Sequence, residues 1–186
     1  MAPAAQGGGT RRRAKPPLPD VLAPGLDLVF CGTAPGRASA QAGAYYANPG
    51  NSFWTALHAV GLTGRQLAPA EFGLLPGLGL GLTDLNKTEI GSDHELSRDG
   101  FDVGALRAKL RRFRPAAIAF TAKAAAAPVL GTASPAYGRQ SVMLEGAVVF
   151  VLASPSGRAR SYWTLDPWRE AASFVRACRT SRRSAA

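Results

Sequence analysis

The amino-acid sequence predicts an α/β fold of three α/β/α layers, in which helices cover both faces of a central, mostly parallel four-stranded sheet. Two observations predict it. Four short apolar runs, at 26–31, 79–85, 115–121 and 147–153, have the length and composition of buried strands. Helical segments alternate with these runs, and strands that alternate with helices are joined by right-handed crossovers into a parallel sheet.

Each predicted helix has its own local signal. Asn51 can cap a helix whose apolar face carries Phe53, Trp54, Leu57 and Val60. Residues 69–71 have the composition of a first helical turn. The clearest helix spans 102–114, where apolar side chains recur every three or four residues opposite a basic face. Helices over 122–130 and 166–179 follow the third and fourth strands.

Length and composition predict one globular domain with two tails. We expect a disordered basic tail over 1–24, a domain over 25–178 and a basic C-terminal tail over 179–186. Cys31 and Cys178 are too few and too far apart for a zinc or iron–sulfur site, and they fit a reducing compartment. No apolar run approaches the roughly 20 residues that cross a bilayer. We therefore expect a cytoplasmic, nucleoid-associated protein of bacterial type, without a metal or cofactor and with no membrane contact.

The net charge of +10 and the pI near 10.6 favour a polyanionic partner, of which nucleic acid is the commonest. Eight of the basic residues lie in the two terminal segments, so the central part of the chain is only mildly basic. Charge alone is therefore compatible with DNA binding but does not establish it.

Three loops follow predicted strands and should meet at one edge of the sheet: 32–36, 84–95 and 154–160. Ligands of parallel sheets bind at the carboxyl ends of the strands. The first loop, Gly32-Thr33-Ala34-Pro35-Gly36, precedes an aromatic-rich segment over 45–54. A glycine loop with free backbone amides, next to aromatic rings and an asparagine, predicts a pocket for a planar base.

From about Leu26 to Val175 the chain resembles the uracil-DNA glycosylase superfamily, most closely its mismatch-specific uracil/thymine branch. The loop 32–36 is similar to the family's Gly-x-Asn-Pro-Gly motif, and Pro49-Gly50-Asn51-Ser52-Phe53-Trp54 to its Pro-x-Asn-x-Phe-Trp segment. Gly81-Leu82-Thr83-Asp84 resembles its third motif, and Ser154-Pro155-Ser156-Gly157 its Asn/His-Pro-Ser-Gly motif. The motifs recur in the family's order.

The resemblance implies a monofunctional DNA glycosylase that acts as a monomer on uracil-containing or mismatched DNA. Such an enzyme flips a deaminated base, uracil first, out of the duplex and hydrolyses its N-glycosidic bond, leaving an abasic site. Two departures affect the catalytic residues. Ala34 replaces the family's water-positioning asparagine, and Ser154 replaces the Asn/His of the last motif. Asn51 and Ser154 are then the catalytic candidates, with a pure helix cap as an equal interpretation of Asn51.

The resemblance also assigns the binding residues. Backbone amides of Gly32, Thr33 and Ala34 would hold an oxygen of the leaving base, and Tyr46 would stack on the flipped base. Asn86 could pair with a pyrimidine edge, but an asparagine at the end of a strand more often forms a turn, and that is its alternative interpretation.

The loop after the fourth strand would contact DNA, and a mobile loop could add a histidine. Pro155, Ser156 and Gly157 would grip phosphate, and Arg158 and Arg160 would occupy the place of a wedge in the base stack. His94 is a possible accessory group, with a solvated loop histidine as its alternative.

Three other functions stay open. A non-catalytic reader of damaged or abasic DNA fits the loss of both familiar polar groups at Ala34 and Ser154. A glycosylase for hypoxanthine or another deaminated purine fits the room that Ala34 leaves. A small-molecule-binding α/β domain is the third alternative, and failure to bind DNA at any salt concentration would indicate it.

Overall fold

A five-stranded sheet runs through the centre of the computed structural model, which describes residues 17–157 and 163–184. The strands lie in the order β2-β1-β3-β5-β4. Their bounds are β1 Leu28–Gly32, β2 Leu80–Asp84, β3 Ala117–Phe120, β4 Gly138–Leu144 and β5 Ala147–Val151. All neighbours are parallel except β4, which is antiparallel to β5. The predicted α/β class and its four strands are confirmed, and the sheet has one strand more than predicted.

The additional strand, β4, lies at the edge of the sheet. Only its end residues, Gly138 and Leu144, are buried, so its sequence lacks the apolar run or alternation that marks the other strands. It joins β5 through the two-residue turn Glu145–Gly146, in which both residues have positive φ. That geometry is typical of a tight hairpin, and Gly146 was the one residue in the sequence that indicated a hairpin at this place.

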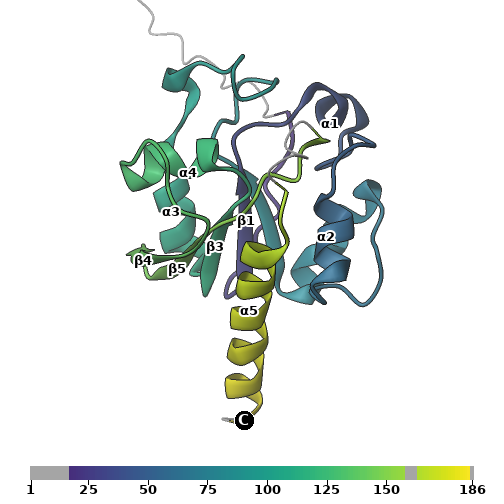
Figure 1. Ribbon diagram of the computed structural model, residues 1–186, viewed down its shortest axis with the longest axis vertical. Helices are drawn as coiled ribbons and strands as arrows, with labels where there is room; N and C mark the ends of the chain where they lie inside the picture. Colours follow the sequence, from purple (N-terminus) through teal and green to yellow (C-terminus); the bar gives the residue numbers. More distant parts are fainter. Residues whose placement is uncertain (1–16, 158–162, 185–186) are drawn as a thin grey trace, which may run out of the picture.

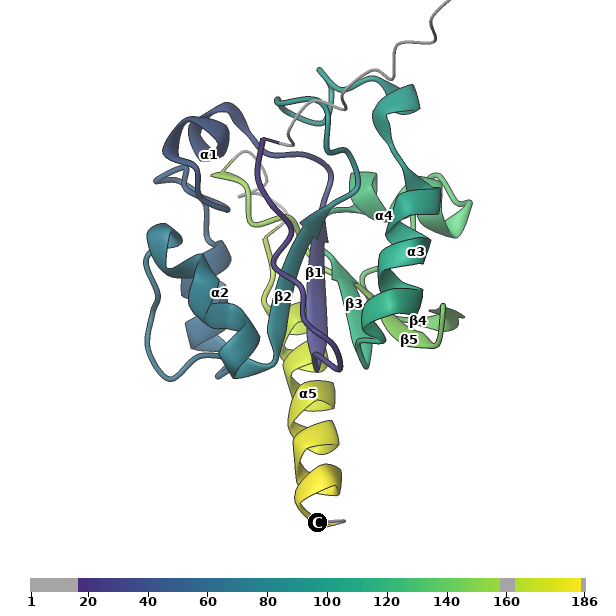
Figure 2. The same ribbon diagram turned by 180° about the vertical axis from the view of Figure 1, so that it is seen from behind.

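Two helical layers enclose the sheet (Figures 1 and 2). On one face lie α2 (Phe53–Ala59), the 3-10 helix η1 (Pro69–Leu78) and α5 (Asp166–Ser184), packed on a core that includes Phe30, Leu82 and Phe150. On the other face lie α3 (Val103–Phe113) and α4 (Lys123–Leu130), packed on Ile118, Phe120 and Val149 among others. Two short elements, α1 (Arg37–Ala42) and η2 (Arg98–Gly100), lie in the connections after β1 and β2.

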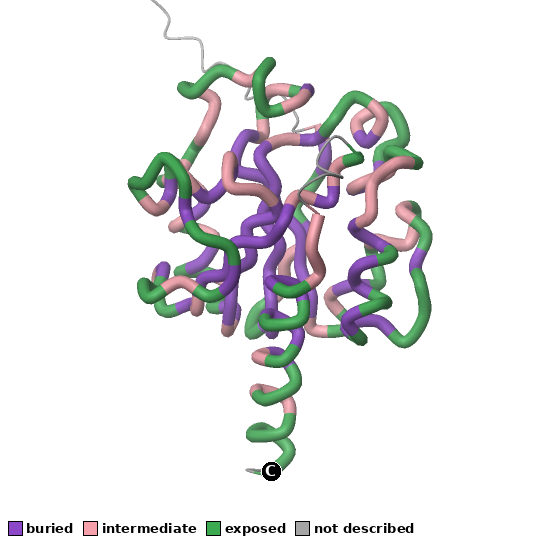
Figure 3. Tube along the Cα trace, viewed as in Figure 1, coloured by how far each residue is buried: buried purple, intermediate pink, exposed green. Residues whose placement is uncertain are grey.

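The ordered structure extends beyond both predicted domain boundaries. Leu18 is buried, and Val21 pairs with Leu82 across the open edge of β2, so packing begins before residue 25. At the other end α5 continues to Ser184, and its Arg179 and Arg182 form ion pairs with Asp27. Burial follows this plan: the sheet is buried, and the last turns of α5 project from the body as an exposed helix (Figure 3). None of the helices among the described residues is long and apolar enough to span a bilayer.

The parallel register brings the carboxyl ends of the strands together. Gly32, the last residue of β1, is opposite Asp84, the last residue of β2. Cys31 is opposite Phe120 at the end of β3, which in turn is opposite Val151 of β5. The loops that leave β2 and β5 therefore begin one and two strand spacings, respectively, from the loop that leaves β1.

Candidate functional site

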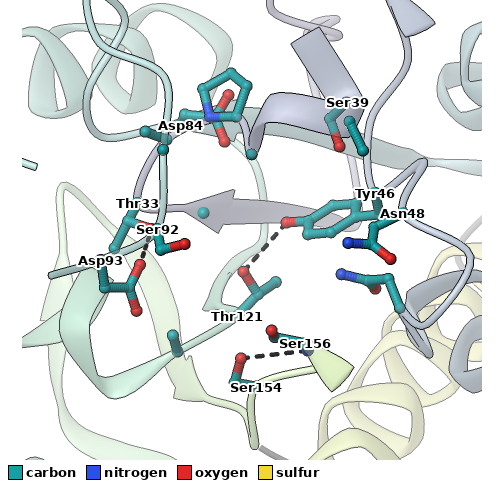
Figure 4. Close-up of a pocket in the computed structure, with 18 of the residues that line it drawn as sticks. Thr33, Ser39, Tyr46, Asn48, Asp84, Ser92, Asp93, Thr121, Ser154 and Ser156 are labelled. Carbon is teal, nitrogen blue, oxygen red and sulfur yellow. Dashed lines mark hydrogen bonds between the residues drawn. The ribbon is translucent and has the colours of Figure 1, made fainter. Parts of the chain in front are cut away.

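A cavity of about 840 Å³ opens at the carboxyl ends of the strands (Figure 4). Its lining comes from all three loops that the sequence analysis singled out, at 32–36, 91–95 and 154–157. Further lining residues come from α1, the segment 45–51 and the end of β3. A cavity of this size holds a ligand as large as a nucleobase.

The floor of the cavity is polar and depends on the absence of a side chain at Gly32. A Cβ there would lie 2.8 Å from Asp84 Oδ1, 3.4 Å from the hydroxyl of Tyr46 and 3.7 Å from Thr121 Oγ1. Those three side chains therefore converge on the end of β1. A glycine at the end of this strand is what allows them to do so.

Asp84 is the buried carboxyl of this floor, with 4% of its surface exposed. Lys87 Nζ lies 3.2 Å from Asp84 Oδ2, and the same ammonium lies 2.9 Å from Asp20 Oδ1 and 2.8 Å from the hydroxyl of Tyr45. Burial raises the pKa of Asp84, and the positive charge of Lys87 opposes that rise without cancelling it. The site thus contains a carboxyl whose protonated form is favoured relative to an aspartate in water.

Tyr46 forms an aromatic wall. Its ring stacks on Phe53 with 3.9 Å between centroids and 12° between planes, so one face is covered by the core. Its hydroxyl lies 3.1 Å from Thr121 Oγ1, and Thr121 in turn donates to the carbonyl of Cys31. Burial raises the pKa of the Tyr46 phenol, so the hydroxyl stays protonated. The ring is fixed at both ends, as a stacking platform requires.

The loop after β2 folds back over the glycine loop. Thr33 Oγ1 donates to Asp93 Oδ1 at 2.5 Å, and Gly91 N donates to the carbonyl of Pro35 at 3.1 Å. An exposed ion pair of 2.8 Å joins Arg37 to Glu95. Asp93 is thereby placed beside the cavity with a second carboxylate oxygen (Figure 4). Neither aspartate was predicted as a site residue. Asp84 lies in the segment that resembles the family's third motif, and Asp93 lies in the long loop after β2, but no local signal distinguishes either from an ordinary loop aspartate.

Asn51 lines the cavity and lies one residue before Ser52, the N-cap of α2. Its Oδ1 accepts the backbone N–H of Phe53 at 2.9 Å, which is the first residue of α2. Neighbouring Asn48 lines the same wall. Asn51 is therefore not the N-cap that the sequence predicted, although its amide oxygen accepts a hydrogen bond from the first turn of α2. The rest of the amide borders the cavity, and a catalytic role for Asn51 stays a prediction.

The loop after β5 closes the remaining side. Pro155 accepts the backbone N–H of Ser52 at 2.8 Å, which ties this loop to the start of α2. Ser154 Oγ accepts the N–H of Ser156 at 3.4 Å. Gly157 approaches closely enough that a Cβ would lie 3.0 Å from the carbonyl of Gly50. Ala34 also lines the cavity, whereas Arg158 and Arg160 lie outside the described residues.

Asn86 does not line the cavity, which corrects the prediction that it pairs with a base. It is fully buried, its Nδ2 donates to Glu89 at 2.5 Å, and its Oδ1 accepts the backbone N–H groups of Thr88 and Glu89. Asn86 is therefore the turn-forming asparagine of the alternative interpretation. His94 is exposed and borders the cavity, so its accessory role stays a prediction. Over residues 17–157 and 163–184, no three His, Cys, Asp or Glu side chains are grouped as metal ligands would be.

These features match a known family. The model of the family described as "UDG: Uracil DNA glycosylase superfamily" matches residues 19–176. The chain belongs to the uracil DNA glycosylase superfamily. It is also similar in fold to the solution NMR structure of a "putative Uracil DNA glycosylase" from Methanosarcina acetivorans, with a TM-score of 0.60 and 24% identity over 86% of this chain and 95% of that one. Membership of the superfamily supports a DNA glycosylase role in base excision repair.

Proposed function

We propose that the protein is a monofunctional DNA glycosylase that removes a deaminated base, uracil first, and leaves an abasic site. The observation that carries this proposal is the cavity at 32–36, 91–95 and 154–157, where one face of Tyr46 borders a space with carboxyl groups at its floor and rim. A flipped base needs a surface to stack on and polar groups at its edge. Two of the loops that line this cavity, 32–36 and 154–157, resemble motifs of the family.

The base edge would face Asp84. Uracil presents an N–H between two carbonyls, and a carboxyl group can accept from the N–H when ionised or donate to a carbonyl when protonated. Backbone N–H groups of residues 32–34 would take up the charge that develops on the leaving base. Hypoxanthine also presents an N–H beside a carbonyl, so a deaminated purine is the second substrate of this proposal.

Asp93 would position the water that attacks the sugar, and Asn51 would be a second residue that holds this water. Bond cleavage generates an oxocarbenium-like sugar, which needs a water held by an acceptor. One oxygen of Asp93 accepts from Thr33, which orients the carboxylate and leaves the other oxygen for the water. This carboxylate supplies the acceptor that Ala34 cannot. Asn51, whose oxygen already accepts from Phe53, would hold the same water as a second ligand.

The test is release of base from labelled oligonucleotides that carry uracil opposite guanine, uracil opposite adenine, single-stranded uracil or hypoxanthine, with alkali to reveal abasic sites. Asp93→Asn should reduce the single-turnover rate by about 10²–10⁴-fold. Asp99→Asn, a carboxylate in the same connection outside the cavity lining, is the matched control and should leave the rate unchanged. Asn51→Ala shows whether the asparagine contributes to base release beyond its hydrogen bond to Phe53.

The alternative that a specific observation favours is a non-catalytic reader of damaged DNA. Ala34 and Ser154 stand where the family's motifs have polar catalytic groups, and such a loss is expected of a protein that has kept the fold of an enzyme but lost its activity. Tight binding to abasic DNA with no release from any of the substrates would establish the reader and refute the enzyme.

A further inference from the structure

The end of the molecule opposite the cavity carries a cluster of arginines. These arginines lie at the end of α3 and on the exposed end of α5, which projects beyond the sheet (Figure 1). The segment 25–27 connects the two helices: Gly25 donates to the carbonyl of Phe113 at the end of α3, and Asp27 receives Arg179 and Arg182 of α5. The arginine pole is defined by Arg112, Arg114, Arg179, Arg182 and Arg183.

This pole has more guanidinium groups than carboxylates. Asp27 is buried and shared by Arg179 and Arg182, which keep 35% and 55% of their side chains exposed. Over the described stretches of the chain, no carboxylate lies within ion-pair distance of Arg112, Arg114 or Arg183, and all three are exposed. Exposed arginines that outnumber the carboxylates at the same end of the molecule favour a polyanion.

A second, shallower cavity of about 540 Å³ lies at the edge of the pole. It is lined by Arg111 and Arg114, by Pro115 and Ala116, and by the turn Glu145–Gly146. Glu145 is already paired with Arg107 and Arg111. Of the two arginines that line the cavity, Arg114 is therefore the one without a carboxylate partner among the described residues. The cavity therefore offers a place for a phosphate group beside a planar donor, the ligand geometry that guanidinium fits best.

We propose that the arginine pole binds the phosphate backbone of a second nucleic-acid segment, separate from the one at the cavity. The two sites are far apart, because the 19 residues of α5 extend over about 28 Å from its first turn to its exposed end. Duplex DNA is stiff over about 150 base pairs, so a segment lying over the cavity does not wrap around to this end. A second contact of this kind lets the protein pass between DNA segments without full release.

Cys178 provides a probe at the pole, since it lies on α5 directly before Arg179 and is partly exposed. Cys31 is fully buried, and burial raises the pKa of its thiol, so it does not compete for a maleimide. A benzophenone maleimide on Cys178 should crosslink an undamaged duplex on illumination. The wild type should give this product also when a hairpin with a non-hydrolysable uracil analogue fills the cavity.

The decisive variant is Arg112→Glu with Arg183→Glu, which changes two arginines that have no carboxylate partner among the described residues. It should lower the crosslinking yield by tenfold or more and reduce the slope of log K against log salt by about 1.8, since each phosphate contact contributes about 0.9. Arg169→Glu is the matched control: it reverses one charge in the first turn of the same helix and should keep the crosslink. Base release and thermal unfolding of the double variant should equal those of the wild type.

Three results would overturn the proposal: no crosslink from the wild type, equal crosslinking by the double variant, or competition by polyglutamate as strong as that by duplex of equal charge. The last result would assign the pole to acidic polypeptides. Failure of the proposed glycosylase function is a separate result, because it would appear as absent base release while the crosslink to undamaged duplex persists.

Discussion

Gly32→Ala tests whether the polar floor of the cavity depends on the close approach of the Asp84 side chain to the backbone of Gly32. The added Cβ would lie 2.8 Å from Asp84 Oδ1, about 0.6 Å inside ordinary van der Waals contact. Asp84 cannot withdraw freely, because it is 4% exposed and Lys87 holds its other oxygen at 3.2 Å. Such overpacking costs about 1–3 kcal/mol. For a protein of this size each kcal/mol lowers Tm by about 2–4 °C.

The same displacement should slow base release. A shift of about 1 Å in a group that positions the substrate can cost about 10²-fold, so we expect a loss of about 10–100-fold for a shift of roughly half that size. Single-turnover release of uracil and a thermal melt measure the two effects. Gly36→Ala is the control on the same loop, because a Cβ there meets nothing within 4 Å and its φ of −68° suits alanine. If Gly32→Ala equals Gly36→Ala in both measurements, the reasoning about the floor is wrong.

Three further predictions concern the aromatic wall at Tyr46, the ion pairs between Asp27 and α5, and the ion pair between Arg37 and Glu95. Tyr46→Leu should weaken binding of DNA with a flipped base by about 1–3 kcal/mol in a fluorescence titration and leave affinity for undamaged duplex unchanged. Asp27→Asn should lower the urea midpoint by loosening the end of α5, since Arg179 loses its carboxylate; an unchanged midpoint would show that the ion pairs contribute nothing. Glu95 accepts the N–H of Ser92 and pairs with Arg37, which lowers its pKa from 4.5 to about 2. Because the pKa of Glu95 is lower in the folded than in the unfolded protein, its ionised form stabilises the fold above about pH 4.5, and this contribution is lost as the pH falls toward 2. The urea midpoint of Glu95→Gln should therefore depend less on pH between pH 5 and pH 3 than that of the wild type.

Local sequence signals predicted most of the fold and the place of the site. The four buried strands have continuous apolar runs, and the loops that follow them carry the glycines and polar residues that line the cavity. β4 was missed because an edge strand buries little and needs no apolar run. Asn86 was misassigned as a base-binding residue because an asparagine at a strand end has the same appearance in sequence whether it faces a ligand or closes a turn.

The sequence by itself predicted four buried strands in a mostly parallel sheet and the three loops at its carboxyl edge, because hydrophobic periodicity and glycine turns are properties of neighbouring residues. Only the tertiary structure decided which side chains meet in the cavity. Thr33 and Asp93 are 60 residues apart in the chain, and Tyr46 and Thr121 are 75 residues apart, yet each pair is hydrogen-bonded. Such contacts depend on the register of the strands and on the path by which the loops fold back, and no local sequence pattern encodes either. The carboxylate proposed to replace the family's asparagine was therefore visible only after folding.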